Sequence, residues 1–370
     1  MKTDYSFSIR ADFNKLIILI LLLFINFFPA LSQYENIEVV KVPEAKVKLY
    51  KRTVNIPDAG NYKVLKCDFH THTIFSDGQV TPEFRVSEGA RRGLDVIAIT
   101  DHLELRRHYI NADHNESYKL AQKKEQQENI LVVPGTELTR RKPFGHFNAL
   151  FVTDANALDV KDPLVAIDKA VQQGAFIMWN HPGWPNDSST LYEVHRELIR
   201  QNKIHGIEIV NEYEFYPVAA AYCEKFNLAY LSNTDIHGVY SEMYATDRLE
   251  SPLTLVFATE RTLAGVKDAL FARRTIALFG DIMMGSKNNL KLLTEACLKF
   301  KTKPASGNTL TVEVSNVSDL NFTLRMQNKV IKVRGGEKVR FVAHPDETII
   351  FPATFINDRS HLEINISEIK

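Results

Sequence analysis

The sequence predicts an α/β fold, a barrel of strands and helices, followed by a small all-β domain. Short and nearly continuous apolar runs alternate with amphipathic segments that carry helix caps. Histidines and carboxylates follow the ends of these runs. From about residue 298 the pattern changes to an alternation of apolar and polar residues, which is typical of strands with one exposed face.

The apolar runs have the length and composition of buried parallel strands. Such strands are covered on both faces of the sheet, so nearly all of their residues are apolar. The expected strands are residues 64–69, 95–100, 130–134, 147–152, 175–179, 206–210 and 228–232.

Helix signals lie between several of these runs. Thr81 and Asp162 are N-cap residues, and each is followed by proline at the first helical position. They predict helices over 81–93 and 162–174, each ending at a glycine. A third helix over 262–272 leads into a last strand at 275–279. Repeated strand–helix units predict a parallel sheet.

Polar residues gather where the predicted strands end. In α/β barrels the active site lies at the C-terminal ends of the strands, because these ends point side chains into a shared crater. The convergence of about seven strand ends favours a closed barrel over an open sheet. The residues concerned are His70, Asp101, His102, Glu137, Asn180, His181, Asn211, Glu212 and Asp235.

Residues 298–370 predict a small β-sandwich-like domain. Alternating runs lie near 310–314, 322–326, 331–333 and 339–341, and Gly335-Gly336 between the last two predicts a hairpin turn. The segment contains few groups suited to catalysis, so we expect a packing or binding role for it.

The N-terminal 32 residues have the pattern of a signal peptide. Lys2, Arg10 and Lys15 precede an apolar run over 16–28, and Ala30-Leu31-Ser32 is a small-x-small site that predicts cleavage near Ser32-Gln33. The run is short for a membrane span, although a retained anchor is the alternative. We expect an exported chain, periplasmic or secreted, with residues 33–62 as an extended lead-in and no stable membrane span after processing.

Composition excludes a globally basic surface. The 370 residues include 45 Lys+Arg and 45 Asp+Glu, so the formal net charge is zero. A phosphorylated substrate must therefore be recognised by a local site, and sequence-specific binding of nucleic acid is not expected. The three cysteines, Cys67, Cys223 and Cys297, show no metal-binding spacing and are expected to be buried thiols, with a single disulfide as the alternative.

Two pairs of ligand-type residues share one spacing. His70 and His72 are two residues apart, as are Asp235 and His237, so each pair can point to one face of a strand. A lone H-x-H has little specificity. Imidazole and carboxylate at many strand ends together predict a site for zinc, manganese or iron.

The ordered motifs resemble the PHP (polymerase and histidinol phosphatase) superfamily, in particular a secreted bacterial branch. They are D-F-H-T-H-T from residue 68, F-S-D-G from 75, T-D-H from 100 and G-T-E from 135. The resemblance implies a distorted (β/α)7-type barrel over 63–285 that hydrolyses phosphate esters with three divalent ions.

The resemblance also implies three ligand sets. The first ion would be held by His70, His72, Glu137 and Asp235, and Glu137 would bridge to a second held by His146 and His181. The third would be held by Asp77, His102 and His237. Asp77 stands where some members have histidine, and the harder carboxylate ligand changes which metal the site prefers.

The chemistry expected from this set is attack of a metal-bridging hydroxide on phosphorus. His70, His72, Glu137 and Asp235 would act through the bound metal and its hydroxide. Asp68 and Asp101 are candidates to orient the ligands, or else to cap local turns.

Candidates for substrate contact lie near the motifs. Arg140 and Arg141 closely follow Glu137, and Arg274 precedes the last strand. His114, with His108, lies in a loop long enough to form a lid. The remaining groups are expected to be structural: Trp179 and Trp184 as packing, with substrate stacking by Trp184 as the alternative, His195 and His205 as surface residues, and Asn180, Asn211 and Asn233 as turn formers with substrate contact as the alternative.

A small phosphorylated substrate, preferably a phosphodiester, is the expected partner. The alternatives are a phosphomonoesterase of the histidinol-phosphatase or nucleotide-phosphatase type, and a non-catalytic metal-binding module. Nucleic-acid processing and amidohydrolase-like chemistry at carbon are more distant alternatives. The sequence does not predict the oligomeric state.

Overall fold

The computed structural model describes residues 51–107, 113–244, 251–327, 329–357 and 359–369. The expected signal peptide, most of the lead-in and His108 lie outside the described residues. No helix within the described part is both long and apolar enough to span a bilayer.

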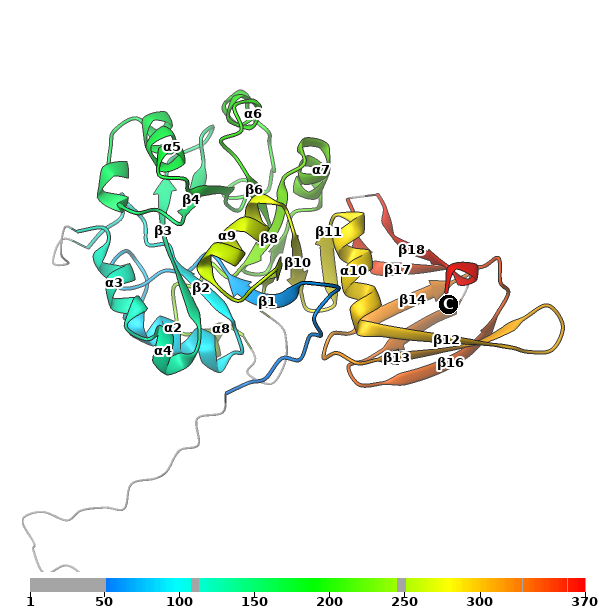
Figure 1. Ribbon diagram of the computed structural model, residues 1–370. Coiled ribbons are helices and arrows are strands. Elements are labelled where there is room, and N and C mark those ends of the chain that lie inside the picture. The colour runs from blue at the N-terminus through cyan, green and yellow to red at the C-terminus, as the bar shows by residue number, and fades with distance from the viewer. Residues whose placement is uncertain (1–50, 108–112, 245–250, 328, 358, 370) are drawn as a thin grey trace, which may run out of the picture. The chain divides into compact units, whose positions relative to one another are not determined.

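The barrel wall is a mixed sheet of parallel and antiparallel strands (Figure 1). Its neighbours follow the order β11-β10-β9-β1-β2-β3-β4-β5-β6, with β8 paired to β6. The bounds are β1 Lys63–Asp68, β2 Val96–Ile99, β3 Leu131–Thr139, β4 His146–Leu150, β5 Phe176–Trp179, β6 Gly206–Asn211, β7 Glu214–Phe215, β8 Ala229–Asn233, β9 Leu253–Ala258, β10 Thr275–Phe279 and β11 Ile282–Gly285.

Side-chain hydrogen bonds join β8 to the other end of the sheet. The Ser232 N–H donates to Thr254 Oγ1 of β9 (2.9 Å), and the Tyr230 N–H donates to Thr275 Oγ1 of β10 (3.1 Å). These contacts bring the two ends of the strand order together, as a barrel requires.

One predicted strand runs in the opposite direction to the expected one. β4 pairs antiparallel with both β3 and β5, whereas a repeated strand–helix pattern predicts a parallel strand. The reason is the short connection after Thr139, because a parallel crossover needs a dozen or more residues and only 140–145 separate β3 from β4. β9 is also antiparallel to both of its neighbours, β1 and β10, and β11 is antiparallel to β10. Both strands extend the expected set.

The predicted helices begin at their expected caps. Thr81 accepts a hydrogen bond from the Phe84 N–H at the start of α2 (Pro82–Arg91), and Asp162 caps α5 (Pro163–Gln172) in the same way. Thr262 caps α9 (Leu263–Phe271). The others are α3 Glu116–Gln122, α4 Glu125–Glu128, η1 Ala155–Leu158, α6 Glu193–Arg200, α7 Pro217–Phe226, α8 Tyr240–Met243 and α10 Lys287–Cys297.

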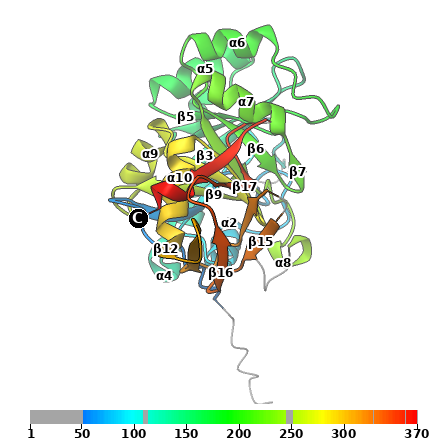
Figure 2. The same cartoon turned by 90° about the vertical axis from the view of Figure 1, so that its right-hand side faces the viewer.

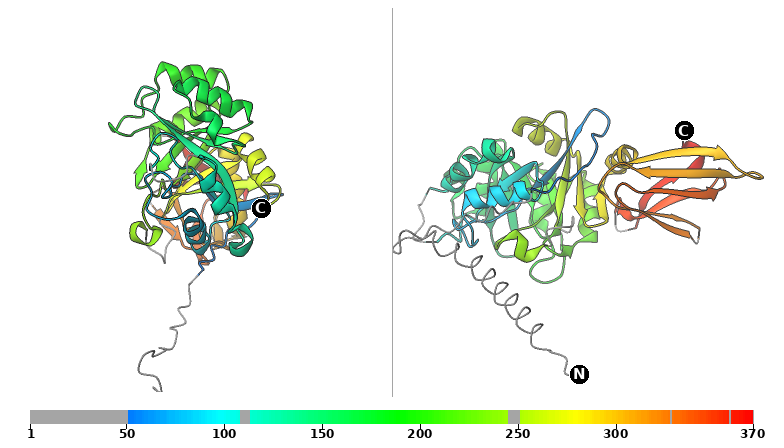
Figure 3. Two further views of the ribbon diagram at one scale, coloured as in Figure 1. Left: turned by 90° about the vertical axis from the view of Figure 1, so that its left-hand side faces the viewer. Right: turned by 90° about the horizontal axis from the view of Figure 1, so that it is seen from below.

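Strands β12 to β18 form the C-terminal all-β region, with α10 between it and the barrel (Figures 1 and 3). Figure 2 looks onto these strands. β12, β13 and β16 form one sheet, while β14, β15, β17 and β18 continue the barrel sheet because β17 pairs parallel with β11. Their bounds are β12 Leu298–Pro304, β13 Leu310–Asn316, β14 Phe322–Met326, β15 Lys329–Val333, β16 Lys338–Ala343, β17 Thr348–Phe355, β18 His361–Asn365 and η2 Ile366–Glu368.

The hairpin prediction at Gly335-Gly336 is wrong. β15 pairs with β14 and β16 pairs with β13, so this turn passes from one sheet to the other. Alternation of apolar residues on both sides of a glycine turn does not distinguish a hairpin from a sheet-to-sheet connection. The cysteines are buried and free, in agreement with the expected thiols.

Candidate metal centre

The strand ends bring the predicted ligands to one edge of the barrel. His70 and His72 follow β1, His102 follows β2 and Glu137 lies within β3. His146 begins the antiparallel strand β4, where it pairs with Thr139, and so reaches the same edge. His181 follows β5, and Asp235 and His237 follow β8.

Four buried atoms converge without a hydrogen-bond partner among the described residues. They are His70 Nε2, His72 Nε2, Glu137 Oε2 and Asp235 Oδ1. Asp235 Oδ1 lies 3.0 and 2.9 Å from the two imidazole nitrogens, and Glu137 Oε2 lies 3.5 and 3.4 Å from them. Ligands about 2.1 Å from one ion in a tetrahedron lie about 3.4 Å apart, so the cluster fits a divalent cation.

The two oxygens of Glu137 face different histidines. Oε1 lies 3.0 Å from His146 Nδ1 and 3.6 Å from His181 Nε2. Oε2 faces His70, His72 and the Nδ1 of His102, the last at 2.8 Å. A carboxylate placed in this way can bridge two neighbouring cations.

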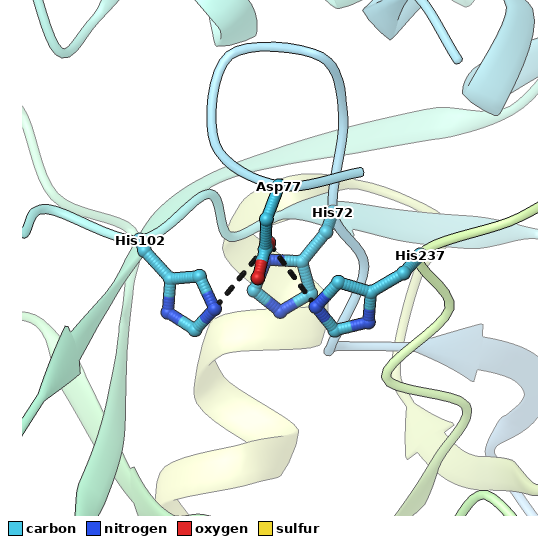
Figure 4. A group of neighbouring side chains, drawn as sticks. All are labelled: His72, Asp77, His102 and His237. Atoms are coloured by element: carbon cyan, nitrogen blue, oxygen red, sulfur yellow. Dashed lines mark ion pairs between the residues drawn. The ribbon is translucent and has the colours of Figure 1, made fainter. Parts of the chain in front are cut away.

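A third cluster surrounds Asp77 (Figure 4). Its Oδ1 lies 3.2 Å from His237 Nε2, 3.5 Å from His102 Nε2 and 3.8 Å from His72 Nδ1. His72 therefore borders two clusters, whereas the implied ligand sets place it in one. The turn that carries Asp77 needs glycine next, because a Cβ on Gly78 would lie 2.6 Å from the Thr73 backbone nitrogen.

Electrostatics favours ionised carboxylates at the centre. Burial opposes the charge on Glu137, but the neighbouring His102 and His70 outweigh it and hold the pKa of this carboxyl well below its usual range. Burial and the charge of His102 lower the pKa of His72 to about 4, so its ring is neutral, as a metal ligand must be. Burial also disfavours charge on His70, but Asp235, Glu208 and Glu137 raise its pKa well above the ordinary value.

Glu208 is a functional candidate that sequence reasoning missed. It is fully buried in β6, and its Oε1 lies 3.2 Å from His70 Nδ1, the ring nitrogen on the side opposite the cluster. The Asn233 side chain donates to Oε1 (2.9 Å) and the His181 N–H donates to Oε2 (2.9 Å). A carboxylate behind a ligating histidine fixes its tautomer and orientation. The signal in the sequence is a lone acid inside the apolar run of residues 206–210.

The Asp101 carboxylate supports the loop that carries His72. It accepts hydrogen bonds from the Thr73 N–H (2.7 Å) and from Ser76 Oγ (2.8 Å), and Ser76 Oγ lies 3.3 Å from His72 Nδ1. The carboxylate therefore orients the imidazole through one hydroxyl.

Asp68 holds the end of β8 against β1. It accepts hydrogen bonds from the Thr234 hydroxyl (2.5 Å), the Thr234 N–H (3.2 Å) and the Tyr240 hydroxyl. Asn180 donates to Glu137 Oε1 (3.0 Å), and Asn211 donates to Glu208 and to Asp235. These asparagines support ligand carboxylates, a role that the expected turn-forming function does not include.

Arg85 ties two ligand loops together from behind. It is completely buried on α2, and its Nε donates to the carbonyl of His72 (3.1 Å). Its Nη2 donates to the carbonyls of residues 236, 237 and 238, and its Nη1 to Glu88 Oε2 (2.8 Å). One guanidinium thus fixes the backbone at both pairs of ligand candidates, His70 with His72 and Asp235 with His237.

Two ligand candidates have strained backbones. His181 has a φ of +25° and Asp235 a φ of +50°, values that non-glycine residues seldom adopt. Such conformations persist where the surrounding structure holds them, and they concentrate at functional sites.

A cavity of about 470 Å³ opens over the ligand candidates. Arg140 and Arg141, two of the candidates for substrate contact, are among its lining residues. Arg140 forms an ion pair with Glu104 and donates to the carbonyls of Thr139 and Val160. Arg141 is exposed at the cavity rim.

Two other candidates lie elsewhere. Arg274 precedes β10, donates to the carbonyl of Phe257 (3.0 Å) and pairs with Asp268. Phe257 pairs with Val64 at the start of β1, so Arg274 is at the opposite end of the strands from the clusters. β10 runs in the same direction as β1, because both strands pair antiparallel with β9, so a residue that precedes β10 lies at this end. The prediction of substrate contact by Arg274 has no support in the fold.

His114 does not line the cavity described above. Its Nε2 lies 3.2 Å from Asp159 Oδ2, and its Nδ1 lies 3.0 Å from Arg106 Nη1. The proposed lid role therefore has no contact to support it among the described residues.

Two histidines expected at the surface are not exposed. His195 is buried with its Nε2 2.8 Å from the Phe144 carbonyl, and burial lowers its pKa to about 4. His205 is half-buried, and its Nδ1 accepts a hydrogen bond from the Ile177 N–H (2.9 Å). Both rings form hydrogen bonds to the backbone of other segments. The sequence does not predict this burial, because histidine is common both at surfaces and in the interior.

Comparison with known proteins adds independent findings. Residues 68–224 match the model of the PHP domain. A crystal structure from Bacteroides vulgatus, described as a two-domain protein containing a predicted PHP-like metal-dependent phosphoesterase, is 32% identical with a TM-score of 0.81. The alignment covers 85% of this chain and 98% of that one.

A curated relative matches over a short region. An uncharacterized protein of Methanocaldococcus jannaschii is 34% identical over 79 residues, which are 21% of this chain. The match spans 36% of the length of that relative.

Proposed function

The chain belongs to the PHP superfamily, and we propose that it hydrolyses a phosphodiester of a small substrate with the help of three divalent ions. The observation that carries the proposal is the convergence of four buried ligand atoms, from His70, His72, Glu137 and Asp235, that have no hydrogen-bond partner in the described part of the chain. Buried polar atoms without partners are costly, and a cation would satisfy all of these at once.

The ligand sets proposed for the ions are those that the family resemblance implies. His70, His72, Glu137 and Asp235 would hold the first, Glu137 with His146 and His181 the second, and Asp77 with His102 and His237 the third. Zinc, manganese or iron suits such donors. The bound ions would supply a nucleophilic water at neutral pH and positive charge against the phosphate oxygens.

The protein side chains contribute position and charge. Glu208 and Asp101 hold the rings of His70 and His72, and Arg85 holds the loops that carry the ligands. Arg141 at the cavity rim would neutralise a phosphate oxygen, because a guanidinium matches the geometry of such an anion.

Two further cavities support the preference for a diester. One of about 350 Å³ shares His146, His181 and Trp184 with the site cavity, and one of about 810 Å³ shares Glu214 with it. A diester carries a group on each side of phosphorus, and each group would have a cavity. A monoester would use only one.

We further propose export of the chain after cleavage near Ser32-Gln33, with a small phosphorylated partner outside the cytoplasm.

Metal content and turnover test this function together. The purified protein, loaded with manganese, zinc or iron(II), is expected to hydrolyse bis-p-nitrophenyl phosphate faster than p-nitrophenyl phosphate. His70→Ala should lose metal and at least a hundredfold in kcat/KM, since one ligand of the first cluster is removed. His344→Ala, an exposed histidine of the C-terminal region, is the matched control.

Either of two results would contradict the proposal. Absence of turnover of both esters at full metal content would leave a non-catalytic metal-binding module. Faster turnover of the monoester would retain the phosphoesterase and reject the diester preference.

A further inference from the structure

A second cavity adjoins the candidate metal centre. We call it the tryptophan cavity and define it by Arg141, Lys142, Trp179, Pro182, Trp184 and Asn186. His146 and His181, both in the second ligand set, form the wall that it shares with the site cavity. A group that enters the tryptophan cavity is therefore next to the proposed phosphate position.

The two tryptophans of the chain have different environments. Trp179 is 2% exposed, and its ring lies 4.1 Å from that of His195, so it belongs to the core. Trp184 is 51% exposed. Its ring centroid lies 5.1 Å from that of His146 and 5.6 Å from that of His181. This indole is therefore half exposed beside two ligand candidates.

The position of Trp184 limits what it can contact. Its ring lies beside the two imidazoles, so a group in contact with it would be the one attached directly to a phosphate at the metal clusters. Indole prefers planar aromatic partners in stacked or edge-on geometry. Lys142 donates to the carbonyls of Pro182 and Ser188. These hydrogen bonds hold the segment that carries Trp184 next to the segment that carries Arg141 and Lys142.

We propose that the tryptophan cavity receives an aromatic ring esterified directly to the phosphate, packed against Trp184. The inference rests on the proposed function, since the phosphate must lie at the metal clusters. Arg141 lines both cavities and is in position to contact the phosphate next to that ring.

Binding of two phosphonates tests the inference without turnover. Phenylphosphonate and methylphosphonate have the same charged group and differ only in the ring. The metal-loaded protein should bind phenylphosphonate about tenfold more tightly in calorimetric titration, because the ring adds stacking and apolar burial. Phenylphosphonate should also change the tryptophan emission saturably, with methylphosphonate having little effect.

Variants assign the effect to one side chain. Trp184→Ala should reduce the preference to less than about threefold while retaining the affinity for methylphosphonate. Trp184→Phe should keep part of the preference and lose the emission change, because only the buried Trp179 then remains. Phe84→Ala removes an aromatic ring of similar exposure on α2 and should retain the full preference.

The outcomes separate the two proposals. Equal affinity for both phosphonates, or a preference that survives in Trp184→Ala, would overturn the aromatic cavity alone. Failure of both phosphonates to bind would overturn the proposed phosphate site and the cavity together.

Discussion

Glu208 shows how a single buried carboxylate organises the candidate centre. It contacts the ring of His70, the backbone of His181 and the side chains of Asn211 and Asn233. These residues come from the ends of four strands, β1, β5, β6 and β8. Each of these hydrogen bonds orients a side chain or a backbone segment at the edge of the first cluster. Glu208 therefore positions the first cluster without being one of its ligands.

Glu208→Gln is expected to weaken metal binding at the first cluster by about 10- to 100-fold, the usual effect of losing a carboxylate behind a ligating histidine. The amide is neutral and has a single acceptor oxygen, so His70 loses its charged partner. Competition with a chelating indicator measures the affinity. Glu193→Gln, an almost fully exposed acid on α6, is the control. Unchanged affinity in Glu208→Gln would show that His70 needs no carboxylate partner.

At the scale of elements, helix α2 supports the two loops that carry His72 and His237. Its N-cap Thr81 fixes the first turn, and one turn later Arg85 donates to the backbone carbonyls of His72 and His237. Tyr240 of α8 completes the arrangement, since its N–H donates to Glu88 and its hydroxyl to Asp68. A shift of helix α2 would therefore displace the ligand candidates that follow β1 and β8.

Arg85→Met should lower the free energy of unfolding by about 3–5 kcal/mol, because it leaves Glu88 and several carbonyls without their buried partner. It should also reduce metal occupancy, through displacement of the loops of His72 and His237. Denaturant titration and metal analysis measure the two effects. Arg91→Met, in the last turn of the same helix, should change stability by less than about 1 kcal/mol. Equal effects of the two substitutions would exclude a special role for Arg85.

At the scale of the whole molecule, one apolar core connects the barrel to the C-terminal strands. Ile276 of β10, Leu293 of α10 and Phe351 of β17 belong to the same buried cluster. β11 and β17 also share a sheet. We propose the boundaries 63–285 and 298–370 for the two regions, but the shared core predicts that they unfold together.

Unfolding in urea should give one transition, whichever probe follows it. Both tryptophans are in the barrel, so their fluorescence reports that region, whereas far-ultraviolet circular dichroism reports all strands and helices. Phe351→Ala should shift both curves equally, with a loss of about 3–5 kcal/mol for a large buried ring. Fluorescence and dichroism transitions that separate would show that the C-terminal strands unfold independently.

The sequence by itself determined the barrel class, the cap residues of the main helices and the gathering of ligand candidates at strand ends. These features depend on local patterns: apolar runs, an N-cap before proline, and histidines that follow a strand. Ordered short motifs then indicated the family. These features can be predicted from sequence because each depends on residues within a few positions of one another.

Only the tertiary structure decided the remaining features. The direction of β4, the sheet-to-sheet turn at Gly335-Gly336 and the far position of Arg274 depend on which strands become neighbours. The roles of Glu208 and Arg85 depend on hydrogen bonds across more than a hundred positions of sequence. Contacts of this length are set by packing, and residue type alone does not encode them.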